Sequence, residues 1–209
     1  RNTDETELLA TVCLMVVTEG GYRMAWVGYA DDDPAGPVRP VAHAGLDNGY
    51  LQDMRASWLD GDGGPAATAM HTGKPCLVQD LDCESGSVTD RDAAARRGFA
   101  SACALPLAAD GRLFGALVVY AATKNAFDPE EVLLLTELAN DLAFGVAALR
   151  ARLAHERINQ ALQQNEFFLR KSQEVGELGS YLFDARQGLW INSPMLDSIF
   201  GIDESYPRT

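Results

Sequence analysis

The residues best suited to catalysis or metal binding are four cysteines and three histidines, which are scattered along the chain. No two cysteines form a Cys-x-x-Cys pair, and no histidine has metal-ligand spacing to a cysteine. The chain contains no Walker phosphate loop and no Gly-x-Gly-x-x-Gly motif. We therefore expect no catalytic residue and no metal site, and no motif identifies a cofactor. The residues concerned are Cys13, Cys76, Cys83, Cys103, His43, His71 and His155.

Charge and composition exclude several classes of partner. The chain of 209 residues has 30 acidic and 17 basic side chains, a formal net charge of −13. Nucleic-acid binding needs a basic stripe, and none is present, so no nucleic-acid partner is expected. No apolar run is long enough to cross a bilayer, and scattered cysteines suit a reducing compartment. We expect a cytoplasmic location and no membrane span in this part of the protein.

Apolar spacing and turn residues indicate an alternation of short helices and strands. The clearest signal is a hairpin in which Asp110-Gly111 forms the turn between β-rich runs at 101–107 and 112–121. The other predicted elements are helices at 4–17, 50–58, 66–71 and 90–97, and strands at 24–30, 38–44 and 76–81.

A long helix follows the hairpin. Asp128 is placed to cap it, Pro129 stands at its first position, and Glu131 is spaced to close a capping box. The apolar helical pattern runs from 132 to 169. The whole order predicts an α+β fold, in which an antiparallel sheet has helices on one side and a looped pocket on the other.

Several short segments are informative together, because both their residues and their order along the chain match one known family. They are Ala25-Trp26-Val27-Gly28-Tyr29-Ala30, Val38-Arg39-Pro40-Val41-Ala42, Gly64-Pro65 with Ala69, Thr72-Gly73-Lys74-Pro75, Ala104-Leu105-Pro106-Leu107, Gly115-Ala116-Leu117, and Phe127 with Glu131. Together they resemble the GAF family over residues 4–152. The resemblance implies a sensory and regulatory domain of a multidomain bacterial signalling protein, with a GAF-type sheet and no catalytic output of its own.

The resemblance also implies where a small ligand would bind. GAF pockets lie between the sheet and the loops that cover it, here roughly residues 43–98, and the motifs do not name the ligand. The aromatic walls and polar anchors expected for such a pocket are Trp26, Tyr29, Trp58, Asp60, Arg91 and Arg96.

Some GAF proteins are free methionine sulfoxide reductases, and this alternative stays open. Cys76, Cys83 and Cys103 invite the comparison. That family, however, places a cysteine in the glycine turn before the short helix, where this chain has Ala66. Photoreception is not expected, because the residues around Cys83 do not match tetrapyrrole attachment contexts.

The last residues show a second pattern. Two short strands flank a turn at Gln187-Gly188, and Ser193 is placed to cap a helix that begins at Pro194. This tail resembles the first hairpin and helix of a PAS domain. We therefore divide the chain into a GAF domain at 1–152, a connecting helix at 153–175, and the opening of an incomplete PAS domain at 176–209.

Apolar residues of the long helix continue beyond the expected domain edge. The same helix of a second copy of the chain could bury these apolar residues. We therefore predict a parallel homodimer, to which helix 4–17 contributes. In this dimer, a ligand signal passes along the helix to the PAS domain and to an output domain of cyclic-dinucleotide turnover or histidine kinase type. The alternative is a dimerisation scaffold without ligand. The predicted dimer residues are Leu135, Leu138, Leu142, Leu149, Leu153, Ile158 and Leu162.

Overall fold

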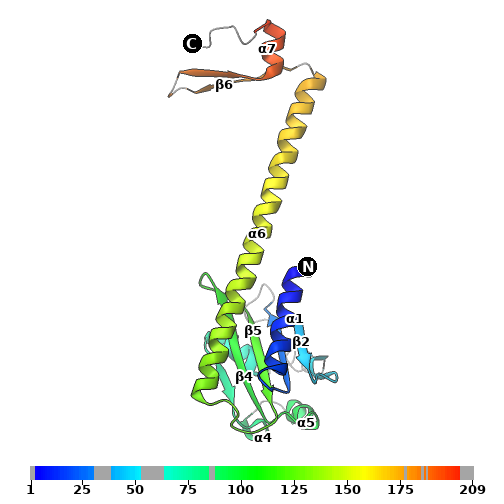
Figure 1. Ribbon diagram of the computed structural model, residues 1–209, viewed down its shortest axis with the longest axis vertical. Coiled ribbons are helices and arrows are strands. Elements are labelled where there is room, and N and C mark those ends of the chain that lie inside the picture. Colours follow the sequence, from blue (N-terminus) through cyan, green and yellow to red (C-terminus); the bar gives the residue numbers. More distant parts are fainter. Residues whose placement is uncertain are drawn as a thin grey trace. The chain divides into compact units, whose positions relative to one another are not determined.

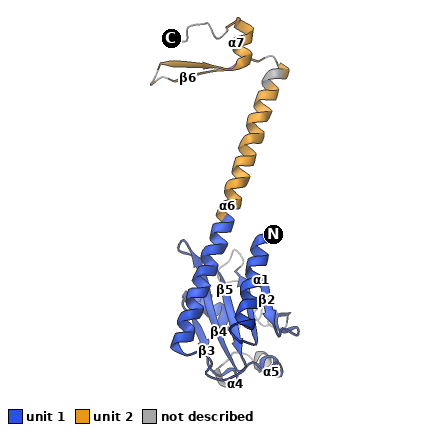
Figure 2. Cartoon of the chain, in the orientation of Figure 1, with its two compact units in different colours: residues 1–150 blue, residues 151–209 orange. Residues whose placement is uncertain are grey.

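The computed structural model describes residues 3–30, 39–52, 64–84, 88–176, 178–184, 186 and 188–202. Two compact units divide the chain, residues 1–150 and residues 151–209 (Figure 2). Helix α6 is common to both. Each unit is described by itself below.

The first unit is built on a five-stranded antiparallel sheet in the order β2-β1-β5-β4-β3 (Figure 1). The predicted hairpin joins β4 to β5, and Asp110 and Gly111 have positive φ angles of 52° and 73°, as a tight hairpin turn requires. The predicted α+β class with an antiparallel sheet is confirmed. The strands are β1 (Met24–Tyr29), β2 (Arg39–Gly45), β3 (Cys76–Val78), β4 (Ser101–Ala109) and β5 (Arg112–Ala121).

One face of the sheet, which we call the helix face, is covered by α1 (Thr3–Thr18) and α6 (Pro129–Gly176) (Figure 1). Apolar side chains from both helices meet alternate residues of the strands there, because successive strand residues point to opposite faces. Members of this core include Leu9, Cys13, Ala25, Val27, Cys103, Leu117, Val119, Leu135, Leu142 and Val146.

The opposite face, which we call the loop face, is covered by shorter elements. These are α3 (Gly64–Thr72), α4 (Leu81–Glu84), α5 (Val88–Arg96) and the segment around Tyr50. The other set of alternate strand residues packs against them. This core includes Met24, Trp26, Tyr50, Ala69, Met70, Leu81, Phe99, Ala104, Val118 and Tyr120.

Helix α6 begins as the sequence predicts, with one difference at its first turn. The Asp128 carboxylate accepts hydrogen bonds from the backbone N–H groups of Glu130 and Glu131, both at 2.9 Å. The Glu131 carboxylate, expected to complete a capping box, instead accepts a hydrogen bond from the Tyr22 hydroxyl. The start of α6 is therefore attached to the segment that leads into β1.

The leucines predicted to face a second copy divide between two environments. Leu135 and Leu142 are 4% and 3% exposed, and Leu138 packs against the same core, so these residues cover their own sheet. For Leu135 and Leu142 the prediction of a dimer contact is wrong. Ile158 and Leu162, by contrast, are 65% and 56% exposed.

The physical reason is the five-residue step from Leu153 to Ile158. Five residues turn a helix by about 500°, so a residue five positions on lies about 140° around the helix axis. The predicted stripe therefore joins residues of two different helix faces. Leu149 and Leu153 are half-buried and continue the face that packs on the sheet.

Among the described helices, α6 is the one that passes a length and composition test for a membrane span. Its apolar residues within the first unit, such as Leu135, Leu142 and Val146, are buried against the sheet. Leu133, Leu134 and Phe144 of the same part of the helix are exposed, so one side of α6 packs on the sheet and another does not.

The described part of the second unit contains the end of α6, a hairpin of β6 (Tyr181–Asp184) and β7 (Leu189–Asn192), and α7 (Pro194–Phe200). The predicted cap of α7 is present, since the Ser193 hydroxyl accepts a hydrogen bond from the backbone N–H of Leu196 at 3.2 Å. Both strands expose large apolar side chains. They are Tyr181, Leu182, Phe183, Leu189, Trp190 and Ile191.

Candidate functional site

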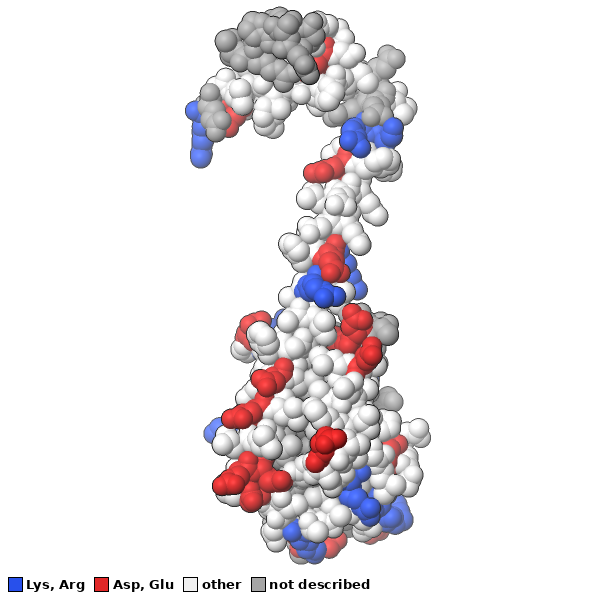
Figure 3. Space-filling model, viewed as in Figure 1, with Lys and Arg blue, Asp and Glu red and all other residues white. Residues whose placement is uncertain are grey.

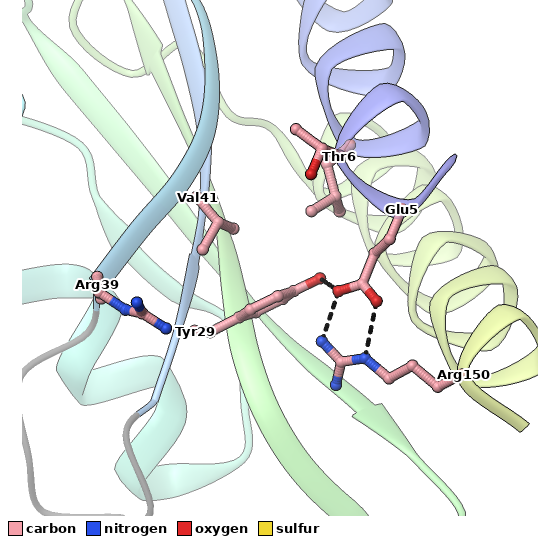
Figure 4. A pocket seen from close by; sticks show the side chains of 7 residues that line it. Glu5, Thr6, Tyr29, Arg39, Val41 and Arg150 are labelled. Atoms are coloured by element: carbon pink, nitrogen blue, oxygen red, sulfur yellow. Dashed lines mark hydrogen bonds and ion pairs between the residues drawn. The ribbon is translucent and has the colours of Figure 1, made fainter. Parts of the chain in front are cut away.

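A polar cluster on the helix face joins three elements that are distant in sequence. The Tyr29 hydroxyl at the end of β1 donates a hydrogen bond to Glu5 Oε1 of α1 at 2.7 Å. Arg150 of α6 donates from Nη2 to Glu5 Oε1 at 2.7 Å and from Nε to Glu5 Oε2 at 3.1 Å. Figure 4 shows the Glu5 carboxylate held between the two partners. The cluster thus ties α1 and β1 to the last residue of α6 in the first unit.

Aromatic rings and burial strengthen this cluster. The Arg150 guanidinium carbon lies 4.7 Å from the centroid of the Tyr29 ring and 5.0 Å from that of Phe114. Burial, with the hydrogen bond to Glu5, raises the pKa of Tyr29 above its ordinary value, so the hydroxyl stays a donor. The hydrogen bonds to Glu5 raise the pKa of Arg150. The cluster therefore keeps a charged guanidinium and a neutral hydroxyl, both of which donate to the Glu5 carboxylate.

A cavity of about 420 Å³ lies beside the cluster. Its volume is within the range of small-molecule sites. Figure 4 shows Arg39 and Val41 of β2 on one side of Tyr29, with Thr6 and Glu5 of α1 on the other. The lining residues are Glu5, Thr6, Leu9, Tyr29, Arg39, Val41 and Arg150.

The residues predicted to form one ligand pocket lie on different faces of the sheet. Trp26 belongs to the loop-face core and is fully buried, whereas Tyr29 lies on the helix face beside Glu5. The expectation that these two side chains share a pocket is wrong. They are three residues apart on one strand, and an odd spacing places side chains on opposite faces.

The remaining predicted ligand contacts come from the covering loops. Trp58 and Asp60 lie outside the described residues, as does the side chain of Arg91, whose backbone is in α5. Arg96 is in the last turn of α5 and is exposed. None of the described contacts brings Arg96 to Trp26.

The described part of the loop face is held by an arginine that the sequence did not single out. Arg97 donates to the backbone carbonyls of Asp47 at 2.9 Å, Ala93 at 2.9 Å and Asn48 at 2.6 Å. Its guanidinium carbon also lies 5.2 Å from the Tyr50 ring centroid. Arg97 therefore joins the end of α5 to the segment after β2.

Three aromatic rings form the wall beneath Arg97. Tyr50, Phe99 and Tyr120 pack with ring centroids between 4.8 and 5.4 Å apart. The Tyr50 hydroxyl donates to the Tyr120 hydroxyl at 3.3 Å. These three rings are buried in the loop-face core together with Trp26, and the sequence did not nominate any of the three as a ligand contact.

Sequence reasoning also missed Glu5 and Arg150. In the sequence, Glu5 is an ordinary acid in the first turn of a predicted helix, and Arg150 is one of several polar residues on the long helix. Their pairing spans 145 residues, and no local pattern reports a contact of that range. The available signal was weaker: both are charged residues at the edge of an otherwise apolar helical pattern.

The described thiols are poorly suited to nucleophilic chemistry. Burial raises the pKa of Cys13 and of Cys103 to about 12, and it also raises the pKa of the half-buried Cys76. Reactive cysteines need a lowered pKa, because the thiolate is the nucleophile. The side chain of Cys83 lies outside the described residues. Within the described ranges, no group of three or more His, Cys, Asp and Glu residues is placed to hold a metal ion.

The sheet with helices on both of its faces defines an α+β domain. A family profile described as the GAF domain matches residues 2–147. The chain therefore belongs to the GAF domain family, whose members are mainly sensory and regulatory modules of signalling proteins. No curated protein matches the chain.

Solved structures share this fold at low sequence identity. A domain of a putative two-component sensor histidine kinase from Sinorhizobium meliloti aligns with a TM-score of 0.58 and 22% identity, covering 75% of this chain and 98% of that one. The GAF domain region of a putative membrane protein from Geobacter sulfurreducens has a TM-score of 0.58 and 20% identity, covering 69% and 94%. Free methionine-R-sulfoxide reductase from Neisseria meningitidis has a TM-score of 0.56 and 21% identity, covering 72% and 83%. At such identities the likeness establishes the GAF-like fold alone.

Proposed function

We propose that this GAF domain is a cytoplasmic sensor that binds a small ligand on the loop face and relays the binding event through α6. The observation that carries the proposal is the attachment of α6 to its own domain. The helix is held at its start by the Tyr22–Glu131 hydrogen bond and at residue 150 by the Glu5–Arg150 ion pair. It then continues to Gly176. A shift in the sheet or in α1 would therefore be passed to the helix.

The loop face is the proposed sensing side. Its core combines a buried indole, three packed aromatic rings and a loop fastened by Arg97, which is the mixture of apolar wall and polar anchor typical of small-molecule sites. Among the proteins of like fold, the Neisseria reductase was solved in complex with its substrate. The chemistry that we propose here is recognition without turnover, since the described buried thiols have raised pKa values.

Relay to a partner requires that α6 meet another helix, and we propose that this is α6 of a second copy in parallel. One stripe of α6 consists entirely of exposed residues. Its members are alternately three and four positions apart, which is the spacing of a coiled-coil seam. Four large apolar side chains lie in it. The stripe, which we call the exposed seam, consists of Phe144, Ala148, Ala151, His155, Ile158, Leu162, Asn165 and Leu169.

The exposed seam differs from the stripe predicted from the sequence. It keeps Ile158 and Leu162 and replaces the leucines of the core-facing side by Phe144 and two alanines. On α1, Leu14 and Met15 are 54% and 43% exposed, so this helix also offers apolar surface for the same bundle.

We further propose that residues 176–209 begin a PAS domain and that α6 passes the signal to it and to an output domain. The support is the hairpin β6–β7 and the capped helix α7, which follow the strand-turn-strand-helix order of the sequence pattern. The six large apolar side chains exposed on β6 and β7 also need a cover that the described residues of this unit do not supply.

Light scattering at several protein concentrations tests the dimer. We expect twice the mass of one chain for the wild type, and a single-chain mass for the pair Ile158→Lys and Leu162→Lys. The matched control is Gln160→Lys with Gln164→Lys, which adds the same charge on the side of the helix away from the seam, since two residues turn a helix by about 200°. A single-chain mass for the wild type, or equal dissociation in both variants, contradicts the proposal.

Hydrogen exchange of α6 tests the relay, and native mass spectrometry tests the sensing. Glu5→Gln should speed exchange around residue 150, while Glu7→Gln, which changes an exposed acid on the same helix, should not.

In native mass spectrometry, the purified protein should carry the added mass of a bound small molecule, which we expect on the loop face. A wild-type chain without any retained mass would favour the scaffold alternative.

A further inference from the structure

We propose that the outer side of α6 in the first unit docks a basic amphipathic helix of another protein. This surface, which we call the acidic stripe, lies on the opposite side of the helix from the residues that pack on the sheet. Each residue turns a helix by about 100°, so the members of the stripe fall within about 100° of its circumference. They are Glu130, Leu133, Leu134, Glu137, Asp141 and Phe144. This inference does not rest on the proposed function.

The apolar members of the acidic stripe are large and face water. Leu133 is 62% exposed, Leu134 is 65% exposed and Phe144 is 74% exposed. Leu135 and Leu142 of the same helix are buried against the sheet, so the fold does cover the other side of α6. A group of exposed large apolar side chains is typical of a surface that contacts another molecule.

The acidic members are exposed as well, and the helix itself does not require all of them. Glu130 lies in the first turn, where the helix dipole favours an acid. Glu137 and Asp141 lie beyond that turn, and like charges four positions apart disfavour a helix. Among the described contacts, none pairs either carboxylate with a base. Their negative charge is therefore available to a partner.

Neighbouring residues add no positive charge to this surface. Residues 3–18 of α1 and residues 129–149 of α6 contain no Lys, Arg or His. Figure 3 shows acidic side chains in red over the first unit, on the side where α6 lies in Figure 1. The surface thus combines apolar side chains with charge of one sign.

A second copy of the first unit is a poor match for the acidic stripe. Counted back from Phe144 in steps of three and four, Asp141 and Glu137 hold the next two positions of the exposed seam. In a parallel pair each acid would face the same acid of the other copy, so we expect helix pairing to stop at Phe144. The complementary partner is an amphipathic helix in which Lys or Arg residues flank an apolar stripe.

Fluorescence anisotropy with a labelled leucine–lysine peptide tests the proposal on the full chain. The peptide has about 18 residues, with leucines at three- and four-residue spacing so that they form one face of a helix. We expect it to bind, and to bind more weakly as salt is added. A peptide of the same composition with scrambled leucines should bind about fivefold more weakly or worse, as should a leucine–glutamate peptide with the original spacing.

Two pairs of substitutions locate the binding surface. Glu137→Gln with Asp141→Asn should raise the Kd of the leucine–lysine peptide by about fivefold or more. Asp92→Asn with Asp110→Asn removes the same charge from exposed positions on α5 and in the β4–β5 turn, and is the matched control. The control pair should leave the Kd within about twofold.

Three results would overturn the proposal. The first is equal binding of the patterned and scrambled peptides, and the second is an equal loss of binding in the two charge-removing pairs. The third concerns a second copy as the occupant, which light scattering of Leu133→Gln with Leu134→Gln detects. These exposed substitutions should weaken peptide binding and leave the mass of the wild-type assembly unchanged. A fall to a smaller assembly would show that another copy of this chain covers the stripe.

Discussion

The guanidinium of Arg150 binds both carboxylate oxygens of Glu5, 145 residues away in the chain, at 2.7 and 3.1 Å. This contact joins the first turn of α1 to the residue at which α6 passes from the first unit into the second. Acidic side chains are spread over the face of the first unit shown in Figure 3. Unlike these surface acids, Glu5 accepts hydrogen bonds from both Arg150 and Tyr29, so its charge helps to hold the elements of the fold together.

The Glu5–Arg150 pair should contribute measurably to stability. The Glu5 side chain is 17% exposed and that of Arg150 is 43% exposed, so water screens the pair only in part. A double-mutant cycle of Glu5→Gln and Arg150→Gln, followed by urea unfolding, should give a coupling free energy of about 1 kcal/mol. Glu7→Gln is the control and should change stability by less than about 0.5 kcal/mol. A coupling of zero would mean that the pair does not hold α6 to α1.

Leu135 and Leu162 should respond differently to truncation, because one is core and the other is exposed seam. Leu135→Ala should lower the free energy of unfolding by about 2 to 4 kcal/mol through loss of buried contacts. Leu162→Ala should leave the unfolding of the first unit within about 0.5 kcal/mol and weaken self-association instead. Urea unfolding and sedimentation on the same samples measure both effects. If Leu162→Ala destabilises the first unit as much as Leu135→Ala, the assignment of the two faces is wrong.

Stability should fall as the pH rises above 9, because two thiols are buried. Burial raises the pKa of Cys13 and Cys103 from 9.0 to about 12. Below pH 9 both thiols are protonated in the folded and the unfolded chain. Above pH 9 the unfolded chain loses these protons while the folded protein keeps them, so each thiol lowers the free energy of unfolding by about 1 kcal/mol between pH 9 and 10.

Urea unfolding at pH 8, 9 and 10 measures this dependence. The double variant Cys13→Ala with Cys103→Ala is less stable at every pH because it leaves cavities, but its decline from pH 9 to 10 should be about 2 kcal/mol smaller. Tyr22 and Tyr29 remain in both proteins, and burial raises their pKa values too, so their contribution cancels in the comparison. Equal slopes for the two proteins would show that the thiols are not the source.

Arg97→Lys should loosen the segment that covers the loop face. A lysine cannot donate to the carbonyls of Asp47, Asn48 and Ala93 at once, so at least one of them loses its partner. We expect a loss of about 1 to 2 kcal/mol and faster hydrogen exchange over residues 46–52. Arg96→Lys, one residue earlier and exposed, is the control and should alter neither quantity. If both variants had similar effects, the proposal that the hydrogen bonds of Arg97 hold the segment after β2 would be contradicted.

The local elements of this protein could be predicted from the sequence because their signals are short-range. Asp110-Gly111 predicted the hairpin of β4 and β5, and Asp128-Pro129 predicted the start of α6. In both cases a few neighbouring residues set the backbone angles or the capping hydrogen bonds. The sequence also implied that Trp26 and Tyr29 lie on opposite faces of the sheet, because they are three residues apart on one predicted strand. The ligand prediction did not use this alternation.

Only the tertiary structure decided which surfaces and charges meet. Periodicity identified apolar positions on the long helix, but it did not distinguish Leu135, which covers the sheet, from Ile158, which is exposed. Likewise, the ordinary acid Glu5 became part of a site only when the fold brought Arg150 and Tyr29 to it. Spacing along a chain determines which residues share a face, whereas what covers that face depends on contacts between segments that local sequence does not record.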